Sequence, residues 1–299
     1  MDHLTDSINK KLTDKEFLGQ LELLLRLTKK LLSHRKKLIP IQKGTAGFEF
    51  NGYRNYSPGD DIKHIDWNVF QRLHELVIKE YTIETPRYWV VALDCSASMF
   101  FYQKIALAKH IAAYLIYLFL SLGDKVIFFL YPQNPLNLCY YQGKKNFYPL
   151  LYELENIKES LSCQTSFTFQ SVFQNLSKNS KAILLSDLYD YEKTREFFSF
   201  CQCKKISAIS AHIIAPEEKN PPIPQGSKIL QDSESQKILK AEISPSFISE
   251  YQQRFQNHIS QIHLLCNQYG IHYQETNPYY AFPKDILDIV QATGLLRRS

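Results

Sequence analysis

The spacing of hydrophobic residues divides the chain into two parts. Within residues 14–37, apolar side chains recur every three or four positions, which predicts an amphipathic helix that Pro40 ends. These side chains are Phe17, Leu21, Leu24, Leu27 and Leu31. Over residues 44–88, glycines separate short aromatic stretches, and residues 75–83 alternate as a strand does. We therefore expect residues 1–87 to form an N-terminal helix and a small β-unit.

A different rhythm begins at residue 88. Tyr88 to Leu93 is a continuous apolar run, which is typical of a strand buried on both faces. The pattern then predicts helices at 103–121, 147–159, 168–178 and 191–202, and strands at 126–131, 182–185 and 206–214. Alternating strands and helices indicate an α/β domain over residues 88–299, with a doubly wound, mostly parallel sheet.

The last third of the chain departs from this rhythm before it resumes. Prolines between residues 216 and 224 indicate an irregular loop, and residues 227–230 and 237–243 can pair as a hairpin. A long helix follows, with Ser244 as its cap, Pro245 in its first position and Gly270 at its end. A strand at 271–274 and a helix at 283–293 complete the pattern.

Composition favours a folded protein, and the charge is local. Of the residues, 44% are hydrophobic and 22% charged, which is ordinary for globular domains. The net charge of +5 lies within residues 1–43. A nucleic-acid or acidic-membrane surface could use such a cluster, but a solvated helix end explains it as well. Aromatic side chains for base stacking do not interleave it, so we expect no nucleic-acid partner.

The sequence predicts neither a membrane span nor an export signal. The most apolar stretch holds an uncharged run of only 12 residues, 111–122, whereas a span needs about 20. Residues 1–11 are polar and charged, unlike a signal peptide. We therefore expect a cytoplasmic protein without a transmembrane segment.

The segment Asp94-Cys95-Ser96-Ala97-Ser98 follows the first buried strand. Ligands of open α/β sheets bind at the carboxyl ends of strands. A carboxylate and two hydroxyls two residues apart can point the same way, and hard oxygen ligands suit Mg²⁺. Taken alone, the segment also fits a simpler role, in which Asp94 or Ser96 caps the next helix.

Two later residues favour the metal site. Thr165 precedes a predicted helix, and Asp187 follows the buried strand at 182–186. Both would meet Asp94 at one edge of the sheet. Five oxygen-bearing side chains from three loops indicate a divalent cation site, with Mg²⁺, Mn²⁺ or Ca²⁺ as candidates.

This arrangement resembles the metal-ion-dependent adhesion site (MIDAS) of von Willebrand factor A domains. The resemblance implies that Asp94, Ser96, Ser98, Thr165 and Asp187 hold the cation directly or through water, and that a protein partner supplies a carboxylate. It also implies the Rossmann-like fold of that family. One departure concerns the loop before Thr165, where Cys163-Gln164 replace the usual Gly-Gly pair.

The upstream segment is similar to domain-of-unknown-function family 58. The matching residues are Phe48-Glu49-Phe50, Tyr53-Arg54, Tyr56 to Asp61, and Ile65-Asp66-Trp67. The resemblance implies an adaptor for an AAA+ ATPase of the MoxR type. Arg54, Asp60, Asp61, Asp66 and Trp67 could contact that partner, but internal ion pairs that fix the β-unit are the favoured interpretation.

An enzyme of the haloacid-dehalogenase type is the alternative, with Asp94 as the nucleophile of a Mg²⁺-dependent phosphohydrolase. That chemistry requires a second acid two residues later, where this chain has Ser96. A lysine that would hold the phosphoryl group is not evident from the sequence either. The chain also lacks a phosphate-binding P-loop motif and a G-x-S-x-G motif. We therefore expect a binding protein rather than an enzyme.

Overall fold

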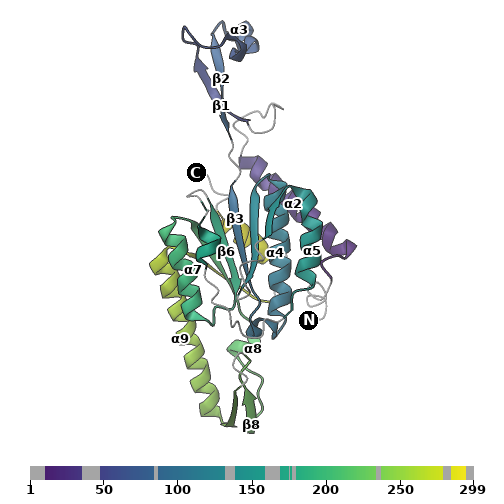
Figure 1. Ribbon diagram of the computed structural model, residues 1–299, viewed down its shortest axis with the longest axis vertical. Coiled ribbons are helices and arrows are strands. Elements are labelled where there is room, and N and C mark those ends of the chain that lie inside the picture. Colours follow the sequence, from purple (N-terminus) through teal and green to yellow (C-terminus); the bar gives the residue numbers. More distant parts are fainter. Residues whose placement is uncertain are drawn as a thin grey trace. The chain divides into compact units, whose positions relative to one another are not determined.

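A computed structural model describes residues 11–35, 48–83, 87–131, 139–158, 169–174, 176, 180–233, 237–278 and 284–293 (Figure 1). The chain forms two compact units. Unit 1 comprises residues 1–26 and 87–299, and unit 2 comprises residues 27–86.

Unit 1 is built on a six-stranded sheet in the order β10-β7-β6-β3-β4-β5. Its strands are β3 (Tyr88–Asp94), β4 (Lys125–Tyr131), β5 (Cys139–Gln142), β6 (Lys181–Ser186), β7 (Ser207–Ile213) and β10 (His272–Thr276). All pairings are parallel except that of β4 with β5. The α/β architecture and the mostly parallel sheet predicted from the sequence are therefore confirmed, and they are compatible with a Rossmann-like fold.

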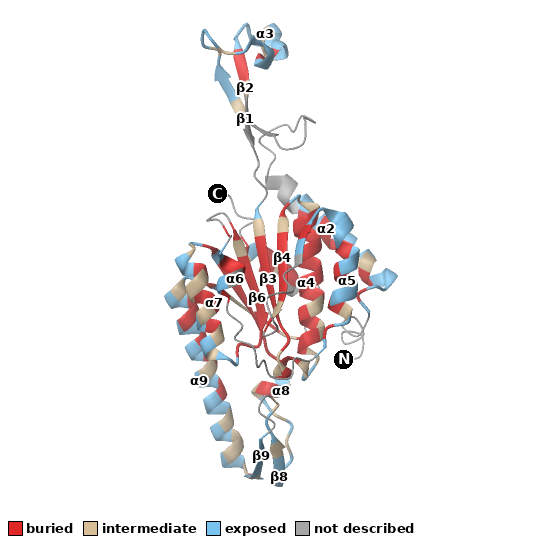
Figure 2. Ribbon diagram, viewed as in Figure 1, coloured by how far each residue is buried: buried red, intermediate tan, exposed pale blue. Residues whose placement is uncertain are grey.

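Helices cover both faces of this sheet. On one face, α6 (Gln170–Phe173), α7 (Tyr191–Cys203) and α9 (Pro245–Tyr269) bury Phe173, Phe197 and Ile262 against the strands. On the other face, α4 (Lys104–Ser121) packs on β3, with the ring of Phe119 stacked on Trp89 at 3.8 Å. Accordingly, Figure 2 shows the central strands as buried. Two-sided burial explains the continuous apolar runs of the strands.

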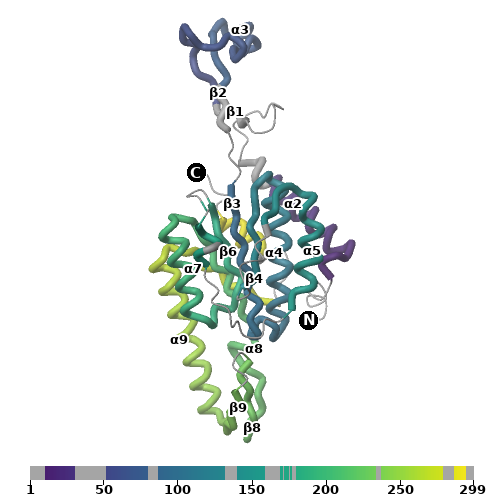
Figure 3. Tube along the Cα trace, in the orientation of Figure 1, coloured from purple at the N-terminus to yellow at the C-terminus, as the bar shows by residue number. Residues whose placement is uncertain are grey.

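Three further helices surround α4. Phe17 of α2 (Lys15–Arg35) is buried and meets the ring of His110 edge-on at 4.8 Å. Helix α5 (Phe147–Glu155) contacts α4, and so does α10 (Lys284–Ala292). Figure 3 shows the start of α2, in purple, beside the teal trace of α5, although about 130 residues separate them in sequence.

Helix α4 is the one described helix that is long and apolar enough to cross a membrane. However, 78% of it is buried within unit 1, which is also how the core helix of a soluble protein behaves. Its burial between the sheet and other helices accounts for its composition.

A hairpin, β8 (Gly226–Gln231) and β9 (Ile238–Ile243), leads into α9. Ser244 caps α9 by accepting a hydrogen bond from the Phe247 amide, and Gly270 ends the helix with φ 65°. Both features were predicted. The short helix α8 (Pro216–Lys219) was not, because the prolines indicated an irregular loop there. Proline is accommodated in a first helical turn, and Pro216 occupies that position.

Unit 2 contains an antiparallel pair, β1 (Phe48–Asn55) and β2 (Val77–Ile83), and the predicted small β-unit is therefore present. A 3₁₀ turn, η1 (Ile62–His64), and helix α3 (Trp67–Leu73) connect the two strands. Helix α3 was not predicted from the sequence, because seven residues are too few to show a helical period.

Candidate metal centre

The candidate site lies where the strand order reverses. Helix α4 leads from β3 to β4 on one side, while β6 flanks β3 on the other. Asp94 is the last residue of β3, and Asp187 directly follows β6. The carboxyl ends of adjacent parallel strands thus bring the two aspartates to one edge of the sheet, as predicted.

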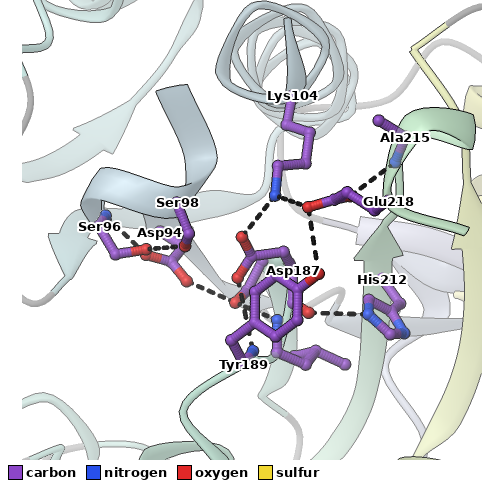
Figure 4. Close-up of polar contacts among 11 residues, drawn as sticks. Asp94, Ser96, Ser98, Lys104, Asp187, Tyr189, His212, Ala215 and Glu218 are labelled. Carbon is purple, nitrogen blue, oxygen red and sulfur yellow. Dashed lines mark hydrogen bonds and ion pairs between the residues drawn. The ribbon is translucent and has the colours of Figure 1, made fainter. Parts of the chain in front are cut away.

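The loop after β3 gathers hydroxyls beside Asp94. The Ser96 amide donates to Asp94 Oδ1 at 2.8 Å, and the Ser96 and Ser98 Oγ atoms lie 3.1 Å apart (Figure 4). A 3₁₀ turn, η2 (Ala97–Phe100), begins after Ser96, whose side chain makes no capping bond. Since α4 begins only at Lys104, neither Asp94 nor Ser96 caps it.

Asp94 and Asp187 are both buried, each with 2% of its surface exposed. Ser186 Oγ donates to Asp94 Oδ2 at 2.5 Å. Burial and then the like charge of Asp187 raise the pKa of the Asp94 carboxyl well above its usual range. A cation between the two carboxylates would relieve both effects.

Lys104, which was not predicted from the sequence as a site residue, reaches this edge from the start of α4. Its side chain is fully buried, and Nζ lies 2.8 Å from Asp187 Oδ2 and 2.5 Å from Glu218 Oε1. Burial alone would lower the pKa of Lys104, but the two carboxylates outweigh it and raise that pKa. The ammonium is therefore held in its charged form.

His212 supports the site from the neighbouring strand β7. Its Nε2 donates to the carbonyl oxygen of Asp187 at 2.8 Å, and its Nδ1 accepts from the Tyr273 hydroxyl at 2.8 Å. Burial lowers the pKa of His212 to about 3, so the ring is neutral. It fixes the backbone of Asp187 without adding charge.

The donor set fits a hard divalent cation. Asp94, Ser96, Ser98 and Asp187 offer carboxylate and hydroxyl oxygens, the ligands that Mg²⁺ prefers. Thr165, Cys163 and Gln164 lie outside the described residues. Among the described residues, there is no group of three or more His, Cys, Asp or Glu side chains that could hold a metal ion. The candidate site therefore depends on hydroxyls as well as carboxylates.

Two carboxylates of the unit 2 signature, Asp60 and Asp66, lie in ion pairs. Arg54 binds Asp60 through two hydrogen bonds of 2.6 and 2.7 Å, which lower the pKa of Asp60 to about 2. Asp66 is buried, caps α3 at the Asn68 amide, and binds Lys79 at 3.1 Å.

Two residues of the signature are more exposed. Asp61 caps η1 by accepting from the Lys63 amide at 3.0 Å. Trp67 is 52% exposed and meets Phe70 edge-on. The carboxylates thus serve turns and ion pairs, while the indole is open to solvent.

The lysine at the sheet edge bears on the phosphohydrolase alternative. A lysine placed for a phosphoryl group was not evident from the sequence, whereas in the structure Lys104 lies beside Asp187. Two carboxylates hold this ammonium and its side chain is fully buried. Ser96 still occupies the position where that chemistry requires an acid.

A comparison with curated proteins finds no match. The family model described as protein of unknown function DUF58 matches residues 52–261. The match includes most of unit 2 and, in unit 1, Asp94, Lys104, Asp187 and Glu218. Because it extends over more than half of the 299 residues, the chain belongs to the DUF58 family.

Proposed function

We propose that unit 1 is a von Willebrand factor A-like module that binds a divalent cation, Mg²⁺ in the first place, and uses it to grip a partner protein. Asp94, Ser96, Ser98 and Asp187 would hold the cation, with Thr165 as the further ligand that the resemblance implies. The bound cation would supply an electrophilic centre that takes up a carboxylate. No reaction is part of this proposal.

The charge balance of the site is the observation that carries the proposal. Three carboxylates, Asp94, Asp187 and Glu218, are buried, and the one ammonium beside them, that of Lys104, contacts Asp187 and Glu218. When all four groups are ionised, they leave an excess of two negative charges. Buried charge of this size is costly unless it is compensated. A divalent cation would match the excess, and it would favour the ionised form of Asp94, whose pKa is raised by burial and by the charge of Asp187.

The nature of the partner follows from the ligands. Serine hydroxyls add no charge to the cation, which keeps it attractive to an outside carboxylate. We propose a protein partner with an exposed Asp or Glu, in the cytoplasm, and a MoxR-type AAA+ ATPase as the complex that the module serves. We infer the ATPase as a partner only from the resemblance to DUF58 proteins.

Thermal unfolding tests the metal site. The wild type and Asp94→Ala are compared in Mg²⁺, in Mn²⁺ and in chelator. A cation at 100 times its dissociation constant should stabilise the wild type by about 2.7 kcal/mol and leave the variant unchanged. Asp60→Ala, which removes a carboxylate in unit 2, is the matched control and should respond to metal as the wild type does. Equal melting temperatures with and without metal in every protein would contradict the proposal.

A second experiment tests the partner. Capture of a purified MoxR-type ATPase by the immobilised protein should require Mg²⁺ and be lost in Asp94→Ala. Capture that persists in chelator would mean that the metal does not grip this partner. Release of phosphate from a generic phosphoester, abolished by Asp94→Asn, would instead support the phosphohydrolase.

A further inference from the structure

Lys104 is a cation built into the proposed metal site. It is the first residue of α4, and its ammonium lies between Asp187 and Glu218, over the ring of Tyr189 at 5.3 Å. Figure 4 shows its side chain pointing from the helix toward both carboxylates. The von Willebrand-type interpretation does not use this residue.

Glu218 fixes the ammonium in this position. Its Oε1 accepts from Lys104 and, at 3.2 Å, from the Tyr189 hydroxyl, while its Oε2 accepts from the Ala215 amide at 2.8 Å. Its backbone carbonyl accepts from the Tyr251 hydroxyl of α9 at 2.8 Å. The carboxylate is therefore held from several sides.

Asp187 is the residue for which two cations compete. Its Oδ2 is occupied by Lys104, and the same carboxylate is a proposed ligand of the divalent cation. A nearby ammonium repels a divalent cation, and it also neutralises part of the carboxylate charge that would attract the divalent cation. Both effects weaken metal binding.

We propose that Lys104 sets the affinity of the site for its divalent cation, because its ammonium acts as an internal competitor for Asp187 that Glu218 holds in place. The inference rests on the proposed function, since it concerns the same site. It assigns Lys104 and Glu218 as positioning residues that keep the cation exchangeable.

The test compares two variants that differ only at residue 104. Glu218→Gln leaves the ammonium on Asp187, and Lys104→Met/Glu218→Gln removes it. The double variant has the same site charge as the wild type, because one positive and one negative group are lost together. Mn²⁺ binding is measured by titration calorimetry on the full chain, after circular dichroism has shown that each variant is folded.

We expect the double variant to bind Mn²⁺ at least about tenfold more tightly than Glu218→Gln. Glu218→Gln itself should bind more weakly than the wild type, because the site has lost a negative charge. Lys219→Met, which removes the partly exposed ion pair with Glu275, is the control and should not change the affinity. If the methionine variant does not fold, Lys104→Gln/Glu218→Gln provides the same comparison with a hydrogen-bonding pair.

The outcomes separate this inference from the proposed function. If the wild type binds Mn²⁺ but the double variant binds it no more tightly than Glu218→Gln does, the role of Lys104 is overturned and the metal site stands. Binding by the double variant but not by the wild type supports the competition and overturns the wild-type metal site. Absence of binding in all proteins overturns both.

Discussion

Removing the buried ammonium of Lys104 should strongly destabilise unit 1 in the absence of metal. Lys104→Met leaves Asp187 and Glu218 without the cation that both contact, in a place where the three side chains are at most 9% exposed. Breaking a buried ion pair by removal of one partner costs about 3–5 kcal/mol. For a unit of this size, the melting temperature should fall by roughly 6–20 °C.

The measurement is urea unfolding of the wild type and the variant at neutral pH in chelator. Lys219→Met is the matched control, since it removes an ion pair of the same type whose side chains are 41% and 35% exposed. Exposed pairs contribute only about 0–1 kcal/mol. Adding Glu218→Gln to Lys104→Met should recover part of the lost stability.

A loss in Lys104→Met no larger than in Lys219→Met would refute this reasoning. It would mean that water reaches the ammonium and screens it, so that Asp187 and Glu218 do not depend on it. An internal cation that competes for Asp187 would then have no structural basis either.

Three further predictions concern other buried polar groups. Because the pKa of Asp94 is raised in the folded state, the folded form keeps a proton that the unfolded form has lost. The stability without metal should therefore fall as pH rises from acid toward neutral. Asp94→Asn should reduce this pH dependence in urea unfolding. Burial lowers the pKa of His110, so the folded form binds a proton less readily than the unfolded form, and stability should be lost as pH falls through the unfolded pKa near 6.5. His110→Gln should reduce the loss of stability between pH 7 and 5. Asp66→Ala removes the α3 cap and the buried carboxylate that Lys79 and the Tyr53 hydroxyl contact, and it should lower the stability of unit 2 by about 1–3 kcal/mol. Asp61→Ala, at an exposed cap, should cost about 1 kcal/mol or less in the same assay.

The sheet was predictable because burial on both faces leaves a plain sequence signal. Runs such as residues 88–93 and 182–185 have few polar residues, and the helices between them carry a clear period. The antiparallel edge strand β5 has only four residues, Cys139–Gln142, and was missed. Short elements whose position depends on a neighbouring strand leave little periodic signal.

The site was predictable only in part, for a similar reason. Asp94 and Asp187 could be placed together because parallel strands carry their following loops to one edge. Lys104 and Glu218 lie 114 positions apart, and neither has a motif around it. A single lysine at the start of an apolar helix was a signal, since burial of such a group requires carboxylate partners. The sequence could not name those partners, because tertiary packing selects them.

The two tryptophans offer an optical consequence of the two-unit division. Trp89, in unit 1, is fully buried, stacked on Phe119, and donates its indole N–H to Asp124 at 2.8 Å, whereas Trp67, in unit 2, is 52% exposed. A water-soluble quencher should therefore dim Trp67 and spare Trp89. In Trp67→Phe, the remaining emission reports on unit 1 alone, so an unfolding curve of unit 1 can be recorded within the intact chain and compared with circular dichroism of the whole.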